Sequence, residues 1–176
     1  MLSQSPQAHG ARLGHVHLRV ADLERATRFY CDLLGFGVTL DGRTYGIQAV
    51  FLAVDDYHHH LALNTWLSAN GMPPPDWHTG LHHVAFVYPG RAALARAVSR
   101  LQASGYPLDG AEDHGATVSV YLRDPDGNGL ELYYDRPRSE WTDADGNPVV
   151  KADPIDVEQI LHASNGSRSA HREETP

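Results

Sequence analysis

The chain has 176 residues, of which 41% are hydrophobic and 20% charged, and its formal net charge is −8, as expected of one globular domain. The acidic balance and the lack of a Lys/Arg cluster argue against nucleic-acid binding, and no apolar run approaches the roughly 20 residues of a membrane span. Cys31, the single cysteine, excludes an intrachain disulfide framework, and residues 1–12 lack the apolar core of a signal peptide, so we expect a cytoplasmic protein.

The first half of the chain predicts a β-α-β-β-β unit at about residues 12–68, after a disordered lead at residues 1–11. Leu13–Val20 alternates polar and apolar residues as a half-buried strand does. Asp22 is a good N-cap for a helix that runs to about Leu34, because apolar residues recur there at helical spacing. Three strands are then expected: Gly37–Leu40, Ile47–Val54 and His60–Trp66.

The same order of elements returns at about residues 80–136, after a linker that contains Gly71 and three consecutive prolines at residues 73–75. His83–Tyr88 predicts a strand, and Arg91–Ala103 predicts a helix with one apolar face. Three further strands are expected: Tyr106–Leu108, Thr117–Arg123 and Leu130–Tyr134.

The two units align residue by residue. His15-Val16-His17-Leu18 corresponds to His83-Val84-Ala85-Phe86, and His60-Leu61-Ala62-Leu63 corresponds to Gly129-Leu130-Glu131-Leu132. Two incomplete sheets, each with one helix, must pack together to form one core. The sequence therefore predicts a single α+β domain at residues 12–138, in which two paired β-α-β-β-β modules form one cupped mixed β-sheet around a metal site.

Residues 139–176 leave this repeat and are expected to form a C-terminal extension. A turn is predicted at residues 145–148, where Asp, Gly, Asn and Pro follow one another. Ile155–His162 predicts a short amphipathic helix. From Ser164 onward the composition is that of a frayed tail.

Histidine is the unusual feature of the composition, with 12 in the chain and nine between His15 and His114. Equivalent strand positions in the two units carry His15 and His83, and the last strand of the second unit carries Glu131. A carboxylate on a half-buried sheet face is costly unless it is paired or bound to a metal. Two histidines and one carboxylate make up a facial triad, which suits non-haem Fe(II) or Mn(II) with open coordination positions.

Each of these residues taken singly also fits an ordinary surface or packing role, and the repeat is what groups them. His17 and His82 are rival ligands. His17 shares a strand face with His15 and could instead support a ligand from behind. His82 is expected to point to the opposite face from His83.

Several segments together resemble one known superfamily. Gly14-His15-Val16-His17-Leu18-Arg19-Val20-Ala21-Asp22 resembles the opening of a vicinal oxygen chelate domain, and Asp124-Pro125-Asp126-Gly127 followed by Leu130-Glu131-Leu132 is similar to its closing motif. That superfamily contains glyoxalase I, bleomycin- and fosfomycin-resistance proteins, methylmalonyl-CoA epimerase and extradiol dioxygenases. More narrowly, residues 57–66, 113–115 and 134–137 resemble the catechol extradiol dioxygenase branch. By this similarity the metal ligands would be His15, His83 and Glu131.

The resemblance implies an extradiol-type ring-cleaving dioxygenase that acts on a catechol-like aromatic diol with O2. Glyoxalases and epimerases take a fourth ligand from the last strand of the first unit, where this chain has Ala62. Fe(II) is the implied metal, with Mn(II), Ni(II) or Zn(II) as alternatives. A homodimer is expected, because small single-domain members commonly pair. Whether the three ligands come from one chain or from two stays open.

The resemblance also implies roles for residues near the metal. A histidine just before Leu61, either His59 or His58, would act as an acid/base during oxygen chemistry. His114 and Tyr121 would form hydrogen bonds with the substrate oxygens. The expected pocket walls are His60, Asn64 and Trp66.

Two other functions are compatible with the same residues. A glyoxalase-like lyase, isomerase or transferase would use its metal only as a Lewis acid and would consume no oxygen. A drug-sequestering resistance-type protein would bind an aromatic compound between walls such as Trp66 and Trp77, and it would need no metal.

Overall fold

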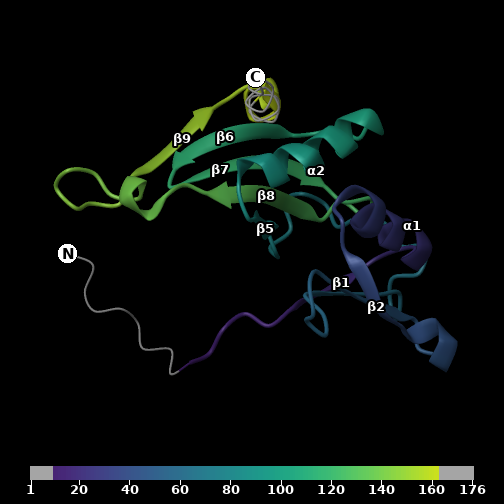
Figure 1. The fold of residues 1–176 in the computed structure, drawn as a ribbon. Coiled ribbons are helices and arrows are strands. Elements are labelled where there is room, and N and C mark those ends of the chain that lie inside the picture. The colour runs from purple at the N-terminus through teal and green to yellow at the C-terminus, as the bar shows by residue number, and fades with distance from the viewer. Residues whose placement is uncertain (1–9, 163–176) are drawn as a thin grey trace, which may run out of the picture.

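The computed structural model describes residues 10–162, which form two modules and a C-terminal extension (Figure 1). The first sheet has the strand order β1-β4-β3-β2 and the second has the order β5-β8-β7-β6-β9. The α+β class and the internal repeat are therefore confirmed. Within the described residues β1 and β5 are edge strands that do not pair with each other, so the modules form two mixed sheets and not one continuous cup.

The helix and strands of module one lie close to the residue ranges predicted for them. Its elements are β1 (Val16–Arg19), α1 (Leu23–Arg28), β2 (Gly37–Asp41), β3 (Ala49–Ala53) and β4 (Leu61–Asn64). Asp22 caps α1 as predicted, because its side chain accepts hydrogen bonds from the backbone N–H groups of Glu24 and Arg25. The helix continues as a π-helical turn at Phe29–Leu33, and a 3₁₀ turn at Gly42–Tyr45 follows β2.

Module two repeats this order with β5 (Val84–Tyr88), α2 (Arg91–Ala103), β6 (Gly110–Gly115), β7 (Thr117–Arg123) and β8 (Gly129–Asp135). The strand predicted at Tyr106–Leu108 is wrong, because pairing starts later, at Gly110. The N–H of Tyr106 still bonds the carbonyl of Leu101 at the end of α2, and its ring packs on Phe29. The backbone of Tyr106 therefore stays bonded to the end of α2, and only its hydroxyl reaches the sheet, where it donates to the carbonyl of Arg123 (3.0 Å).

The extension adds a strand that the sequence pattern did not predict. β9 (Val150–Pro154) pairs antiparallel with β6 at the edge of the second sheet. The predicted helix is present as α3 (Val157–Leu161), which packs on α2 and buries Ile160 in the core. The expected turn at residues 145–148 is also present. The tail from Ser164 and the lead at residues 1–9 lie outside the described residues.

The strand registers confirm the alignment of the two units. β1 and β4 run parallel with Val16 opposite Leu61, and β5 and β8 run parallel with Val84 opposite Leu130. One step along each strand, His17 faces Ala62 in the first sheet, whereas Ala85 faces Glu131 in the second. Ala62 therefore occupies the position in module one that Glu131 occupies in module two.

The turn before β8 joins the two modules. Asp124 is buried, and it accepts hydrogen bonds from the Tyr30 hydroxyl (2.8 Å) and from the backbone N–H groups of Asp126 and Asn128. Burial, and next the charge of Asp124, raise the pKa of Tyr30 well above its usual value. Asp126 accepts from the N–H of Ala21 at the end of β1 (2.8 Å). The closing motif of module two therefore also makes hydrogen bonds that connect it to module one.

We expect Asp124→Ala to lower the free energy of unfolding by about 3 kcal/mol, because it removes several hydrogen bonds to a buried carboxylate. Tyr30→Phe removes one of these bonds and should cost only about 1 kcal/mol. Urea denaturation of the two variants beside the unaltered chain measures both losses. Equal losses would show that the backbone bonds of the turn contribute little.

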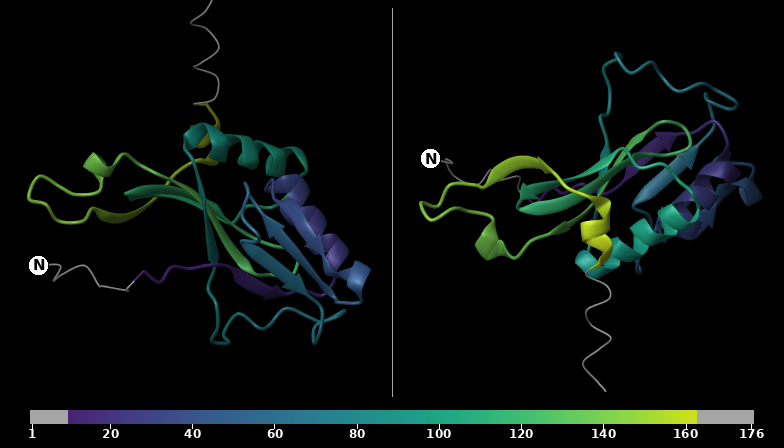
Figure 2. Two further views of the ribbon diagram at one scale, coloured as in Figure 1. Left: turned by 60° about the horizontal axis from the view of Figure 1, so that its bottom comes forward. Right: turned by 90° about the horizontal axis from the view of Figure 1, so that it is seen from above.

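Helices α1 and α2 each cover one face of their own sheet, and no helix of residues 10–162 covers the opposite faces (Figures 1 and 2). On β5 that opposite face carries Ala85 and Val87, both exposed, with Val87 at 58%. Among residues 10–162, no helix has the length and apolar character that a membrane span requires. The uncovered faces are where the expected functional residues lie.

Candidate functional site

Module two brings His83 and Glu131 into direct contact. Glu131 lies on β8 and His83 lies just before β5, and Nε2 of His83 is 3.0 Å from Oε2 of Glu131. The other oxygen, Oε1, accepts a hydrogen bond from the Ser119 hydroxyl at 2.6 Å and a longer one from Tyr121 at 3.3 Å. The two hydroxyls hold the carboxylate so that Oε2 faces the histidine.

This pair fits two neighbouring ligands of a divalent metal. Two ligands at right angles and about 2.1 Å from a metal lie about 3.0 Å apart, which is the separation between His83 and Glu131. Hydrogen bonds to the remaining oxygen of a ligating carboxylate are also typical of metal sites. Ser119 was missed by the sequence reasoning, although it shares a strand face with Tyr121 two residues away.

The sequence predicted that His82 points away from His83, and this prediction is wrong. His82 instead contacts His83 directly. Nδ1 of His82 lies 2.8 Å from Nδ1 of His83, so Nε2 is the nitrogen of His83 that remains for a metal. Strand alternation does not apply to these two residues, because β5 begins only at Val84. His82 therefore lies on the side of the His83 ring that faces away from Glu131.

His114 and Tyr121 lie next to Glu131, on β6 and β7. Nε2 of His114 is 2.7 Å from the Tyr121 hydroxyl, and Nδ1 is 3.0 Å from the carbonyl oxygen of Lys151. Burial, and next the charge of Glu131, raise the pKa of Tyr121 to about 12, so its hydroxyl keeps its proton at neutral pH. The two residues assigned to substrate binding are thus adjacent to the candidate metal pair.

His15 and His59 form a second group, on module one. Their ring centroids are 4.4 Å apart, and Nδ1 of His59 lies 2.7 Å from Nδ1 of His58. Burial, and next the neighbouring His15, lower the pKa of His59, which favours its neutral form. The predicted acid/base is therefore next to one predicted ligand but belongs to the other module from His83 and Glu131.

Asn64 organises the rest of the module-one face. It is buried, its amide nitrogen donates to Nε2 of His17 at 2.9 Å, and its amide oxygen accepts from the N–H of Trp66 at 3.2 Å. The His17 ring lies 5.3 Å from the Trp66 ring. Nε2 of His17 is therefore engaged by Asn64. His60 is turned toward Tyr57, with ring centroids 4.6 Å apart.

The two groups remain apart in one chain. Between residues 10 and 162, no three His, Cys, Asp or Glu side chains lie close enough together to hold a metal. We name His83, Glu131, Ser119, Tyr121 and His114 the acidic half-site, after Glu131. The histidine half-site consists of the module-one residues His15, His17, His59 and Asn64.

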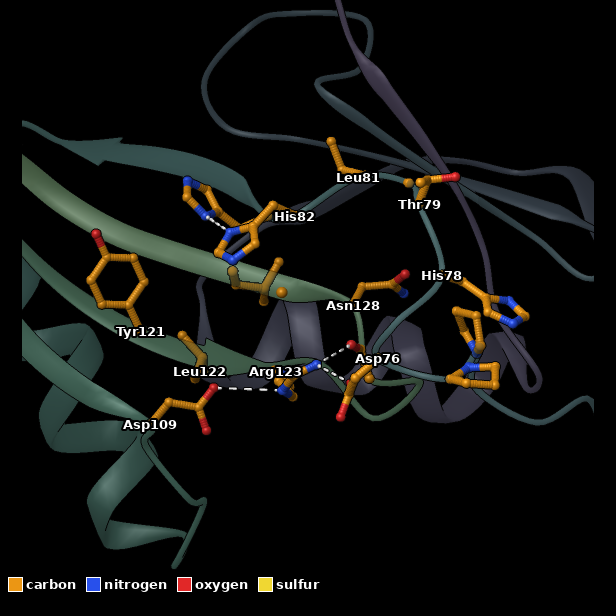
Figure 3. A pocket seen from close by; sticks show the side chains of 17 residues that line it. Asp76, His78, Thr79, Leu81, His82, Asp109, Tyr121, Leu122, Arg123 and Asn128 are labelled. Carbon is orange, nitrogen blue, oxygen red and sulfur yellow. Dashed lines mark hydrogen bonds and ion pairs between the residues drawn. The ribbon is translucent and has the colours of Figure 1, made fainter.

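A pocket of about 690 Å³ adjoins the acidic half-site. Figure 3 shows Tyr121 and His82 at one end of this pocket. Its floor includes Arg123, which pairs with Asp76 (3.5 Å) and Asp109 (3.7 Å). Linker residues 74–76 and 78–81 also line the pocket, together with His83 and Tyr121. A small molecule in this pocket can therefore reach the acidic half-site.

Comparison with known proteins identifies the family of the chain. The model of the Glyoxalase/Bleomycin resistance protein/Dioxygenase superfamily matches residues 12–132. A catechol-2,3-dioxygenase of Bacillus subtilis (strain 168) is 38% identical over 157 residues, which cover 89% of this chain and 53% of that protein. The chain thus spans about half the length of that relative. Biphenyl-2,3-diol 1,2-dioxygenase 2 of Rhodococcus globerulus is 31% identical, over 86% of this chain and 82% of that protein.

Lyases and solved structures are similar to it as well. A lactoylglutathione lyase of Haemophilus influenzae is 29% identical, over 67% of this chain and 88% of that protein. The crystal structure of a glyoxalase/dioxygenase from Nostoc punctiforme superposes with a TM-score of 0.60 at 21% identity, over 76% of this chain and 97% of that one. This last likeness concerns the fold alone. The chain belongs to the glyoxalase/bleomycin resistance protein/dioxygenase superfamily.

Proposed function

We propose that the chain is an extradiol-type dioxygenase that cleaves the ring of a catechol-like aromatic diol with O2, and that its metal is Fe(II). The observation that carries this proposal is Ala62, which is fully buried at the position equivalent to Glu131 and cannot ligate. With three side-chain ligands, half of an octahedral metal stays open for a diol and O2. The names of the dioxygenase relatives support the same reaction.

The chain's own residues would hold the metal and orient the substrate. When bound at His83, Glu131 and His15, Fe(II) would supply a site that accepts both diol oxygens together with O2. Ser119 keeps Glu131 in place. Tyr121, next to Glu131, presents a hydroxyl to a substrate oxygen. The lowered pKa of His59, caused first by burial and then by His15, favours the neutral ring, which can accept a proton.

We further propose that the third ligand is the partner's His15 in a homodimer. The acidic half-site of one chain has two ligands and the histidine half-site has the third, and one chain leaves them apart. A two-fold dimer that places the histidine half-site against the acidic half-site of the other copy forms two complete sites.

Anaerobic loading with Fe(II), followed by a panel of catechols and oxygen, tests the reaction. We expect equimolar consumption of O2 and diol and a yellow ring-fission product. Parallel samples loaded with Mn(II), Ni(II) or Zn(II) separate this reaction from the lyase alternative, which would turn over thiol adducts without oxygen. Stoichiometric Fe(II) with no oxygen uptake on any catechol would overturn the proposal.

A further inference from the structure

β9 lies beyond residues 12–132, which the superfamily model matches, yet it touches the acidic half-site. Its pairing with β6 is irregular: Asp113 faces Asp153 and Gly115 faces Val150, with a register shift between them. Two residues of β9 therefore lie opposite the single residue His114. Bulges of this kind commonly lie next to functional sites, where they redirect a side chain or a backbone group.

The bulge sets the proton position on the His114 ring. The Lys151 carbonyl oxygen, 3.0 Å from Nδ1, can only accept a hydrogen bond, so Nδ1 carries the proton. In the neutral ring Nε2 is then an acceptor. It lies 2.7 Å from the Tyr121 hydroxyl, whereas the nearest carboxylate oxygen, Oε2 of Glu112, is farther away at 3.5 Å. The Tyr121 hydroxyl has a single proton, and its 2.7 Å contact with His114 is shorter than its 3.3 Å contact with Oε1 of Glu131. The proton therefore points mainly toward His114, and the lone pairs of the Tyr121 oxygen remain for another donor.

Several contacts hold the Lys151 carbonyl in this place. The Lys151 ammonium pairs with Asp113 at 3.1 Å and with Asp153 at 2.9 Å, and Arg136 also pairs with Asp113 at 2.7 Å. Gly115 follows His114 with a φ of +84°, and a side chain there would collide with Val149. The backbones of β6 and β9 are thus anchored on both sides of His114.

We propose that β9 is a positioning strand for the reaction: the Lys151 carbonyl holds His114 in its Nδ1–H form, so that Tyr121 donates to His114 and accepts from the substrate hydroxyl. Only one part of this inference, the hydrogen bond that Tyr121 accepts from the substrate, rests on the proposed function. The direction of the hydrogen bonds in the substrate-free chain stands on the geometry alone. Free histidine favours the opposite form, with the proton on Nε2, so the strand has a measurable effect.

Long-range proton–nitrogen NMR of the full chain, labelled with nitrogen-15 histidine, reads the form of each ring directly. The spectra are recorded at about pH 8, above the pKa of free histidine. A His114→Phe variant assigns the resonances. We expect His114 to show a protonated Nδ1 and an unprotonated Nε2, both without metal and with diamagnetic Zn(II).

A backbone ester provides the decisive variant. Incorporation of lactic acid in place of Ala152 converts the amide after Lys151 into an ester, whose carbonyl is a weaker acceptor, without altering any side chain. His114 should then lose its fixed Nδ1–H form, and kcat for the diol should fall about five- to tenfold while KM changes less than about twofold. The matched control is lactic acid at position 144, which weakens the Asp143 carbonyl, an acceptor of the Gly146 N–H in the same extension. That control should leave both the ring form and kcat unchanged.

The results separate the two proposals. An Nε2–H form in the unaltered chain, or an unchanged ring form in the position-152 ester, overturns the positioning role, whatever the enzyme activity. A fixed Nδ1–H form that the position-152 ester alone disrupts supports that role. Ring cleavage by the unaltered chain tests the dioxygenase proposal independently, in a separate assay.

Discussion

Glu131→Ala is expected to abolish stoichiometric Fe(II) binding and to lower kcat/KM for the diol by at least about 1,000-fold. Glu131 is the only carboxylate in contact with His83 within the described residues, and its Oε2 faces the histidine at 3.0 Å. Loss of this oxygen leaves the acidic half-site with a single nitrogen ligand. Metal content after dialysis and oxygen uptake in the presence of catechol measure the two effects separately.

Ser119→Ala is a milder change at the same site, with which Glu131→Ala can be compared. It removes the 2.6 Å hydrogen bond to Oε1 but leaves Oε2 beside His83, so metal affinity should weaken about 10- to 100-fold without being lost. Excess Fe(II) should then restore most of the activity of Ser119→Ala and none of that of Glu131→Ala. Full metal content in Glu131→Ala would show that the metal is bound elsewhere.

The second large effect is expected from a heterodimer of two inactive chains. If each site combines one chain's acidic half-site with the partner's His15, a dimer of His15→Ala with Glu131→Ala has one site with both lesions and one intact site. Such a heterodimer, purified through two different tags, should therefore show about half the activity of the unaltered dimer. Each parent homodimer should be nearly inactive.

A heterodimer of His83→Ala with Glu131→Ala is the matched control. Both lesions fall in the acidic half-site, so each of its two sites lacks one ligand and the dimer should be inactive. An inactive His15→Ala/Glu131→Ala heterodimer would show that His15, His83 and Glu131 of one chain act together. Sedimentation of each purified sample confirms that dimers are being compared.

Local and repeating features could be predicted from the sequence. The cap at Asp22 and the helix Arg91–Ala103 depend on residues close to each other in the chain, so their patterns are visible without a structure. The equivalence of Ala62 and Glu131 also followed from the repeat, because parallel pairing with the same register recurs in both modules. The residue types of the candidate triad could thus be predicted from the sequence alone.

The sequence pattern failed where tertiary contacts decide. β9 has a weak strand pattern and exists because β6 offers it an edge. The delayed start of β6 reflects the contacts of Tyr106 with Leu101 of α2 and with Phe29 of the π-helical turn. The role of the Lys151 carbonyl has no side-chain signature, since every residue has a carbonyl.

By itself, the sequence determined the two-module α+β fold and the kinds of side chain available to a metal, because residue type and spacing carry that information. Only the tertiary structure decided that His83 and Glu131 meet, that Ser119 and Tyr121 hold the carboxylate, and that His15 belongs to a different half-site. These are distances between segments far apart in the chain, and they depend on how the two modules pack. No local pattern encodes them.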